Sequence, residues 1–211
     1  MPARPQSLRL VLVTDRSASA RPLPVVVEAA VRGGVTAVML REKDMATRDL
    51  YDLAVELRRI TQRAGALLIV NDRVDVALAA GADGVHLGWQ SLPFEKVRAL
   101  MGESRLVGAS THSPDEARRA AQQGADYVTF GPVFPTPSKA GLVEVQGVEG
   151  VAAARRGLSV PLVGLGGIDP ENAAQVLRAG ADGVAAIRAL VAPEDPEQAA
   201  RAFARAWRPS P

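Results

Sequence analysis

The chain contains no cysteine, which excludes disulfide bonds and thiolate metal sites and is typical of a reducing compartment. Aromatic residues make up only 4% of it, and no basic run is interleaved with them, so a nucleic-acid-binding surface is not expected. The early apolar run Leu10–Val13 is far too short for a signal-peptide core or a membrane span. These absences predict a cytoplasmic protein whose partners are neither nucleic acid nor membrane.

Lysine is scarce as well, although the formal net charge is +2. Only Lys43, Lys96 and Lys139 are lysines among the 25 basic residues, and the rest are arginine. Arginine is therefore the ordinary surface cation, and a lysine kept in a loop indicates that a compact point charge is needed there. The 211 residues, 47% of them hydrophobic, suffice for one good-sized core, so we expect a single domain over residues 1–211.

Short β-branched runs alternate with longer amphipathic stretches along the whole chain, a pattern typical of parallel strands joined by helices. The strands are predicted at residues 9–14, 37–41, 67–71, 84–87, 105–110, 127–131, 161–166 and 183–187. Helices are predicted at residues 47–63, 114–123 and 170–179, the last two opening on a capping residue followed by proline. Such a series predicts an α/β protein with a single (β/α)8 TIM barrel of parallel strands. An open doubly wound sheet is the alternative.

A short glycine-alanine-aspartate segment precedes three of the predicted strands. It lies at residues 81–85, 124–128 and 180–184, with residues 33–38 as a looser copy. Each glycine can close a helix in the left-handed conformation, so the segment marks the structural, amino end of the strands. Unusual residues, most of them polar, lie at the opposite ends, and in a barrel the carboxyl ends of the strands form the active site. These residues include Arg41, Asn71, His86, Ser110, His112 and Gly166.

Gly166-Gly167 follows a predicted buried strand, and a helix begins directly afterwards. Backbone amides in such a turn are free to face an anion, and barrels repeatedly bind phosphate after their last two strands. We therefore interpret Gly166 and Gly167 as part of a phosphate site, with a plain tight turn as the alternative.

Three further loops carry groups that suit an anionic substrate. Of Arg41 and Lys43, at least one is expected to point into the barrel mouth. The alternative is that both belong to a charge cluster in solvent. Asp72, after Asn71, is either a magnesium or substrate ligand or a helix N-cap. The loop after residue 131 places two hydroxyls and an ammonium close together, which suits a phosphate or diphosphate. These groups belong to Thr136, Ser138 and Lys139.

His86 and His112 are the two histidines, and both fall at carboxyl strand ends. A lone histidine is often a buried structural residue. His112 nevertheless follows Ser110-Thr111 directly at the mouth, where an imidazole with a pKa near neutral can move a proton.

Taken together, these motifs resemble the thiamine-phosphate synthase family and its TenI-like branch over nearly the whole chain. The matching segments are residues 40–44, 70–75, 84–88, 108–113, 131–139 and 164–168. Synthases join a hydroxymethylpyrimidine diphosphate to a thiazole phosphate with magnesium. The resemblance implies that pyrophosphate is held by Arg41, Lys43, Thr136, Ser138 and Lys139. It implies that Asp72 is a magnesium ligand, and that thiazole phosphate is held by Gly167, Ile187 and Arg188.

Three departures from the synthase pattern are evident. Ser91 stands where that pattern has a second acidic magnesium ligand, and Met39 stands where a glutamine recognises the pyrimidine. Arg188 replaces a usual serine. The loss of a metal ligand together with a pyrimidine contact resembles the TenI-like branch, whose described role is thiazole tautomerase. That reaction aromatises a carboxylated thiazole phosphate by proton transfer and needs no metal.

The first hypothesis is therefore a thiazole tautomerase with His112 as its proton carrier. A magnesium-dependent synthase is second, and a non-catalytic protein that binds a phosphate ligand is third. The expected partner is a small-molecule thiazole phosphate. No cofactor is expected unless the synthase hypothesis holds, in which case Asp72 binds Mg²⁺. The oligomeric state stays open, a homo-oligomer included.

Overall fold

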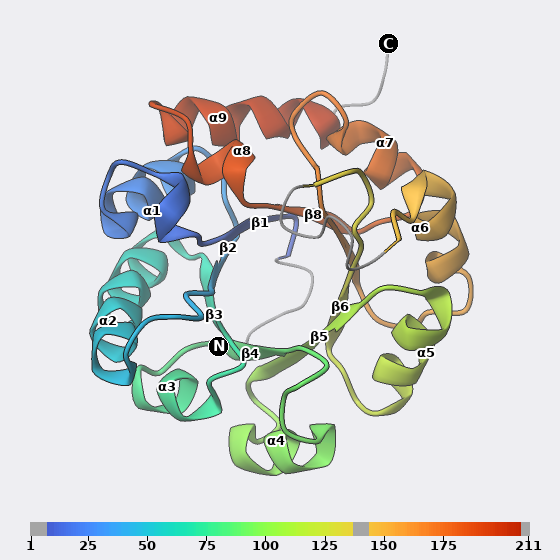
Figure 1. Ribbon diagram of the computed structural model, residues 1–211, viewed down its shortest axis with the longest axis horizontal. Helices are drawn as coiled ribbons and strands as arrows, with labels where there is room; N and C mark the ends of the chain where they lie inside the picture. Colours follow the sequence, from blue (N-terminus) through green and yellow to red (C-terminus); the bar gives the residue numbers. More distant parts are fainter. Residues whose placement is uncertain (1–7, 137–143, 208–211) are drawn as a thin grey trace.

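The computed structural model describes residues 8–136 and 144–207. Its strands pair only in parallel and close into a barrel in the order β1 to β8, with β1 hydrogen-bonded to β8 (Figure 1). This confirms the predicted TIM barrel, and each strand lies within a residue or two of its predicted bounds. The strands are β1 (Leu10–Val13), β2 (Ala37–Leu40), β3 (Leu67–Asn71), β4 (Gly84–Leu87), β5 (Leu106–Thr111), β6 (Tyr127–Phe130), β7 (Leu162–Leu165) and β8 (Gly183–Ala186).

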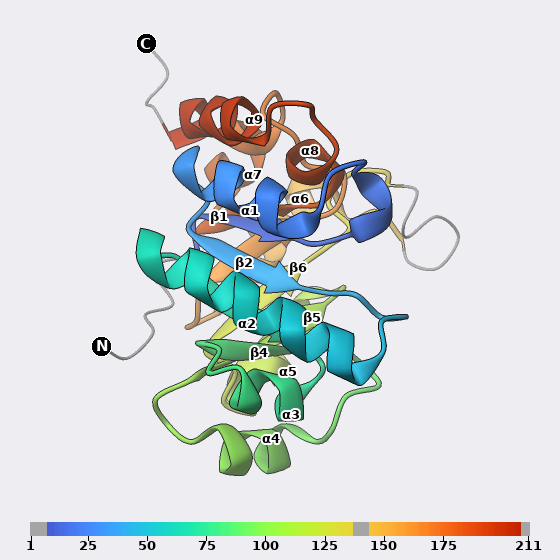
Figure 2. The same cartoon turned by 90° about the vertical axis from the view of Figure 1, so that its left-hand side faces the viewer.

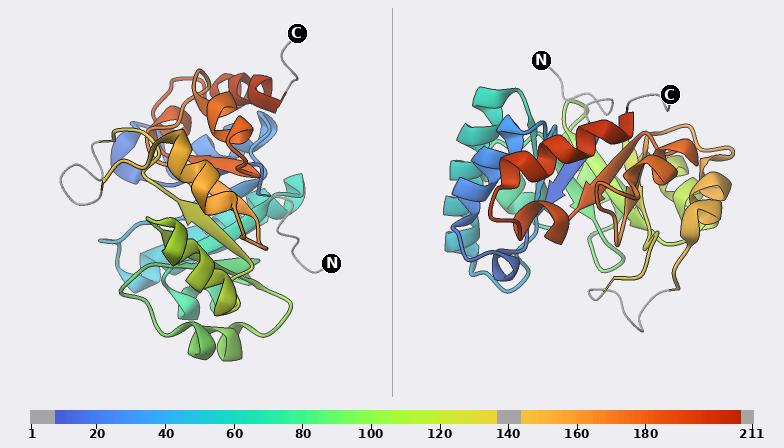
Figure 3. Two further views of the ribbon diagram at one scale, coloured as in Figure 1. Left: turned by 90° about the vertical axis from the view of Figure 1, so that its right-hand side faces the viewer. Right: turned by 90° about the horizontal axis from the view of Figure 1, so that it is seen from above.

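Helices surround the barrel on its outside (Figures 1 and 3). They are α1 (Leu23–Arg32), α2 (Thr47–Ala64), α3 (Val74–Ala79), α4 (Phe94–Met101), α5 (Pro114–Gln122), α6 (Gly147–Arg155), α7 (Ala173–Arg178), α8 (Arg188–Val191) and α9 (Pro196–Phe203), with short 3-10 helices η2 (Arg16–Ala18) and η4 (Ala204–Trp207). Over the ranges that the structure describes, no helix combines the length and apolar character needed to cross a bilayer.

One predicted helix start is wrong. Helix α5 begins at Pro114 behind its Ser113 cap, as expected. Helix α7 begins at Ala173 and not at Pro170. The reason is local: the Asp169 carboxylate accepts from the amides of Glu171 and Asn172, which folds these residues into a separate turn before the helix.

Side chains alternate along each strand between two apolar layers. One cluster fills the barrel interior and includes Val11, Met39, Ile69 and Val163. The larger cluster lies between the sheet and the helices. Because successive strand residues face opposite sides, the inward set predicts which residues at the carboxyl ends point into the mouth, the open carboxyl end of the barrel seen from the side in Figure 2.

At the amino end, the glycine-alanine-aspartate segments form a repeated brace. In each copy the aspartate Oδ2 accepts from the amide of a residue near the start of the preceding strand, and the aspartate amide donates to the carbonyl of that same residue. The pairs are Asp83 with Leu68, Asp126 with Val107, and Asp182 with Leu162. The same Oδ2 also meets an arginine of an earlier helix at 2.6–2.9 Å, namely Arg58, Arg98 or Arg155.

The looser copy forms the same double contact with a threonine. The Leu10 amide donates to Thr36 Oγ1, and the Thr36 amide donates to the Leu10 carbonyl. The brace therefore closes the strand pairs β1–β2, β3–β4, β5–β6 and β7–β8, which confirms that this face is structural.

Removal of one brace is expected to weaken the fold. Asp126→Ala leaves the buried Val107 amide without its side-chain acceptor and Arg98 without its carboxylate. A buried donor left unsatisfied costs about 2 kcal/mol, which denaturant unfolding measures. The matched control is Asp115→Ala, whose ion pair with Arg118 lies on the surface and is expected to contribute about 0.5 kcal/mol or less. Equal effects of the two changes would contradict the stabilising role of the brace.

Candidate active site

The predicted site residues surround one mouth. Arg41 directly follows β2, Asn71 ends β3, and Ser110 is the penultimate residue of β5. All three share the inward parity of the apolar layer below them, where Met39 lies two residues before Arg41 and is only 2% exposed. Gly131 and Gly166 follow β6 and β7, and Ile187 follows β8. The expectation that these residues gather at one end of the barrel is confirmed.

His86 lies inside the barrel and connects its interior to the mouth. Its Nδ1 lies 3.0 Å from the Tyr127 hydroxyl, and its Nε2 lies 3.0 Å from Ser110 Oγ and 3.2 Å from Thr129 Oγ1. Burial lowers the pKa of His86 to about 3, so the ring stays neutral, with one nitrogen donating and the other accepting. A ring held in this way is poorly suited to carry protons and well suited to orient the Ser110 hydroxyl.

His112 lies in the loop after β5 and is held against the first turn of α5. Its backbone amide donates to Glu116 Oε2 at 2.7 Å, and its ring Nδ1 lies 3.3 Å from the same oxygen. The side chain is 22% exposed. A carboxylate at Nδ1 fixes the orientation of the imidazole, which is the arrangement used for general acid-base chemistry.

Asp72 has an unusual backbone. It is exposed, and its φ of 66° is the one positive value among non-glycine residues in the described ranges. Its amide donates to the His86 carbonyl at 2.9 Å. The interpretation of Asp72 as a helix N-cap is wrong, because α3 begins at Val74 behind Arg73 and has no side-chain cap. A left-handed aspartate that caps nothing is a strained residue of the kind that clusters at functional sites.

The double glycine allows two loops to approach closely. Gly166 and Gly167 have φ values of 103° and 63°. A Cβ at Gly167 would lie 2.7 Å from the Pro135 carbonyl oxygen, next to Thr136. The turn therefore packs against the loop after β6. The Gly167 amide donates to no acceptor in the part of the chain that the structure describes, so it is available to an anion. Ser138 and Lys139 lie outside the described residues.

The turn after β8 adds a second group near this position. Ile187 is the N-cap of α8, and Arg188 is the first residue of that helix and is exposed. No ion pair involves Arg188 within residues 8–136 and 144–207. The structure therefore places Arg188 at the carboxyl end of β8, on the surface of the protein.

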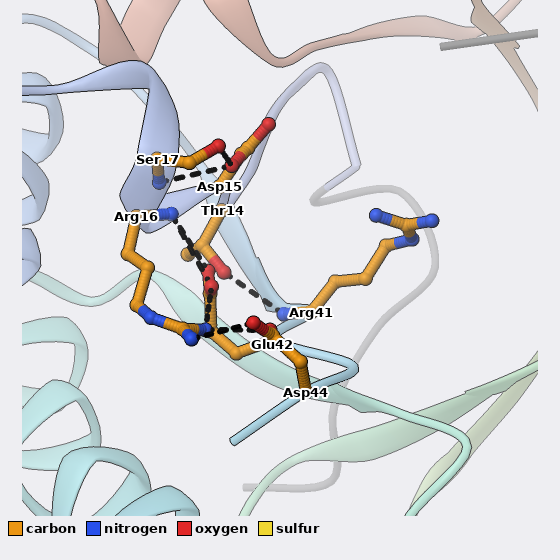
Figure 4. Close-up of polar contacts among 7 residues, drawn as sticks. All are labelled: Thr14, Asp15, Arg16, Ser17, Arg41, Glu42 and Asp44. Atoms are coloured by element: carbon orange, nitrogen blue, oxygen red, sulfur yellow. Dashed lines mark hydrogen bonds and ion pairs between the residues drawn. The ribbon is translucent and has the colours of Figure 1, made fainter.

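A group that the motifs did not reveal lies beside Arg41. The Arg41 amide donates to Thr14 Oγ1 at 2.9 Å, while Glu42 and Asp44 both turn to Arg16 of the β1–α1 loop (Figure 4). A cavity of about 590 Å³ lies next to this group, between that loop and α2, and includes Met45 in its lining. No periodicity indicates the group, because Arg16 begins a single short 3-10 turn in the connection between β1 and α1. The alternation of cations and acids in Arg41-Glu42-Lys43-Asp44 was the available signal.

A closed parallel barrel with cations, a strained aspartate and a glycine turn around its carboxyl mouth defines a barrel enzyme. The chain belongs to the thiamine monophosphate synthase family, whose model matches residues 10–190. A putative thiamine-phosphate synthase of Geobacter sulfurreducens is 52% identical over 92% of both chains. The thiamine-phosphate synthase of Chloroflexus aurantiacus is 48% identical over 92% of this chain and 89% of that one. The structure of a thiamine phosphate pyrophosphorylase from Pyrococcus furiosus superimposes with a TM-score of 0.89, at 38% identity over 96% of both chains.

Proposed function

We propose that the protein is a thiamine-phosphate synthase, which joins a hydroxymethylpyrimidine diphosphate to a thiazole phosphate and releases pyrophosphate. The observation that carries this proposal is the identity of 48–52%, over some nine-tenths of the chain, with relatives that bear this name. It replaces the tautomerase, which the departures at Ser91 and Met39 favoured, as the first hypothesis.

In this proposal the mouth binds two anionic substrates. Arg41, with Lys43 and Thr136, holds the diphosphate, and Ser138 and Lys139 complete that set. The Gly167 amide, Ile187 and Arg188 hold the thiazole phosphate, while Asn71 and Ser110 contact the rings. The bond from the pyrimidine methylene carbon to the diphosphate oxygen breaks, a bond to the thiazole nitrogen forms, and pyrophosphate leaves. The protein contributes mainly by holding the reacting atoms together in the right orientation.

The residues at the mouth fit magnesium only together with a diphosphate. In the described part of the chain, no three His, Asp or Glu side chains converge where a metal would fit. Asp72 is a single carboxylate, and the Ser91 hydroxyl is neutral and accepts from the Gly88 amide at 2.8 Å. Magnesium in proteins commonly combines one or two carboxylates with substrate phosphates. The ion would then neutralise charge on the departing pyrophosphate, and Asp72 would be its ligand from the protein.

The proposal is tested with both substrates, with and without magnesium, by chromatography of the product. We expect thiamine phosphate and an equal amount of pyrophosphate with magnesium, and no product after chelation. Calorimetry should show weak or undetectable magnesium binding to the free protein and clear binding once pyrophosphate is present. A protein that forms no thiamine phosphate under any of these conditions is not a synthase. Tight magnesium binding to the free protein would contradict the metal assignment.

Thiazole tautomerase is the second candidate, and specific residues favour it. Met39 offers the pyrimidine no hydrogen bond, and Ser91 supplies no charge for a metal. His112 is oriented by Glu116, as a proton carrier requires. The same protein preparation, incubated with the carboxythiazole phosphate tautomer and no metal, tests this candidate directly.

A further inference from the structure

The segment Arg41-Glu42-Lys43-Asp44 carries two acids among its two cations, and the acids all face one way. Glu42 is buried, with its side chain only 3% exposed, and both its oxygens lie 3.2 Å from the Arg16 amide. Its Oε2 also accepts from Arg16 Nη1 at 3.1 Å. This residue therefore ties the loop after β2 to the loop after β1 through a backbone contact as well as a charge.

Asp44 holds the same guanidinium through two bonds. Arg16 Nη1 and Nη2 donate to its two oxygens, each at 2.7 Å. This side-by-side geometry is the strongest form of an arginine-carboxylate contact. Asp44 foremost, and then Glu42, raise the pKa of Arg16, and Arg16 lowers the pKa of Asp44. The Asp44 side chain is nevertheless 77% exposed. Without Arg16, its carboxylate would therefore be free to move in solvent.

Arg41 points the other way. In Figure 4 its guanidinium extends away from the Arg16–Glu42–Asp44 group, and its amide is fixed by Thr14 at the end of β1. Neither Arg41 nor Lys43 forms an ion pair within residues 8–136 and 144–207. The segment thus consists of two acids that both contact Arg16 and of two cations that have no carboxylate partner in the described ranges.

We propose that Arg16 is a positioning residue for anion binding: it holds the carboxylates of Glu42 and Asp44 so that Arg41 and Lys43 stay available to a diphosphate. This inference rests on the proposed function, because it assumes that these cations bind the diphosphate. Without Arg16, the Glu42 carboxylate still has the amide of residue 16, whereas Asp44 is released one residue from Lys43. A free carboxylate there competes with the diphosphate for the cations and repels it.

The test is pyrophosphate binding to the full chain by calorimetry, at fixed magnesium, with KM and kcat measured in parallel. Arg16→Gln is expected to weaken pyrophosphate binding about fivefold to tenfold, the order of effect of one charge a few ångströms away in a watery environment. KM for the diphosphate should rise by a similar factor while kcat changes less than twofold. The matched control is Arg32→Gln. Arg32 also contacts two carboxylates, those of Glu28 and Glu197, but it lies in the last turn of α1, on the side of the barrel where the strands begin. It should bind as the wild type does.

A second change separates charge from loop packing. Arg16→Gln combined with Asp44→Asn lacks the released charge, so it should regain most of the pyrophosphate affinity while staying less stable to heat. Arg16→Lys keeps the positive charge without the two-pronged contact, so its affinity for pyrophosphate should fall about twofold to threefold. This variant should stay folded even if Arg16→Gln does not fold.

Unchanged pyrophosphate affinity in Arg16→Gln, or in Arg16→Lys when Arg16→Gln does not fold, overturns the inference. It is likewise overturned if the double variant binds as weakly as Arg16→Gln, because Arg16 then acts only by packing the loop. If the wild type binds pyrophosphate and makes thiamine phosphate, and the Arg16 variants bind pyrophosphate as tightly as the wild type, only this inference is refuted and the proposed function stands. A wild type that binds no pyrophosphate refutes the proposed function with it.

Discussion

Gly167→Val is expected to weaken binding of thiazole phosphate, or of inorganic phosphate, by at least about 100-fold while the protein still unfolds in one cooperative step. The new Cβ would lie 2.7 Å from the Pro135 carbonyl oxygen and 2.8 Å from Phe134 Cβ, and the backbone has a φ of 63°. Backbone atoms must therefore move, and the amides facing the anion move with them. Loss of about two charge-assisted hydrogen bonds accounts for a change of this size. Calorimetry measures the affinity, and circular dichroism follows the unfolding.

Gly81→Val is the matched control. Gly81 has nearly the same φ, 64°, but nothing lies within 4 Å of its Cβ position, and it belongs to the amino end. The two variants share the backbone strain and differ in position and crowding. Phosphate affinity that is unchanged in Gly167→Val, or lowered equally in both variants, would place the phosphate elsewhere.

The tautomerase candidate predicts that His112→Asn lowers turnover of the carboxythiazole tautomer by about 10²- to 10⁴-fold, the usual contribution of a general acid-base group. Formation of thiamine phosphate should change less than tenfold, because that coupling breaks no carbon-hydrogen bond. Asparagine keeps a hydrogen-bonding group near Glu116 but cannot shuttle a proton. Chromatography of both reactions, with substrate affinity measured beside them, provides the comparison.

The outcomes of this experiment separate the two candidate activities. A wild type that leaves the tautomer unchanged removes the tautomerase from consideration. A variant with wild-type turnover of the tautomer assigns the proton transfer to another group at the mouth. His86 is not that group, because burial lowers its pKa to about 3 and both ring nitrogens contact other side chains.

The barrel was predictable because its signals are local and repeated. Alternation of strands and helices, together with the echo around Asp83, Asp126 and Asp182, defines both the fold and the face that carries no chemistry. The start of α7 could not be predicted, because it depends on which nearby backbone amides donate to the Asp169 carboxylate. At the mouth, strand ends located Arg41, Asn71 and Ser110 correctly, since parity along a strand decides direction.

The Arg16 contacts and the φ of Asp72 could not be predicted. They depend on how irregular loops from neighbouring strands meet, which no period in the sequence encodes. Likewise, the pattern showed Gly166-Gly167 as a turn or a phosphate site. The structure adds a further demand on these glycines, the close approach of the loop after β6 at Phe134 and Pro135.

The repeated brace divides the barrel into four quarters of two strands each, and the borders between the quarters follow the even-numbered strands. One brace consists of an arginine, a strand amide and an aspartate. All three lie between the end of one even-numbered strand and the start of the next even-numbered strand. The borders are therefore the loops after β2, β4, β6 and β8. The loops after β2, β4 and β6 hold Lys43, Ser91 and Thr136, and the turn after β8 leads directly into Arg188 at the start of α8. Substitutions in those four loops therefore leave every brace intact, whereas Asp72, His112 and Gly167 lie in loops within a quarter, whose two strands a brace holds together.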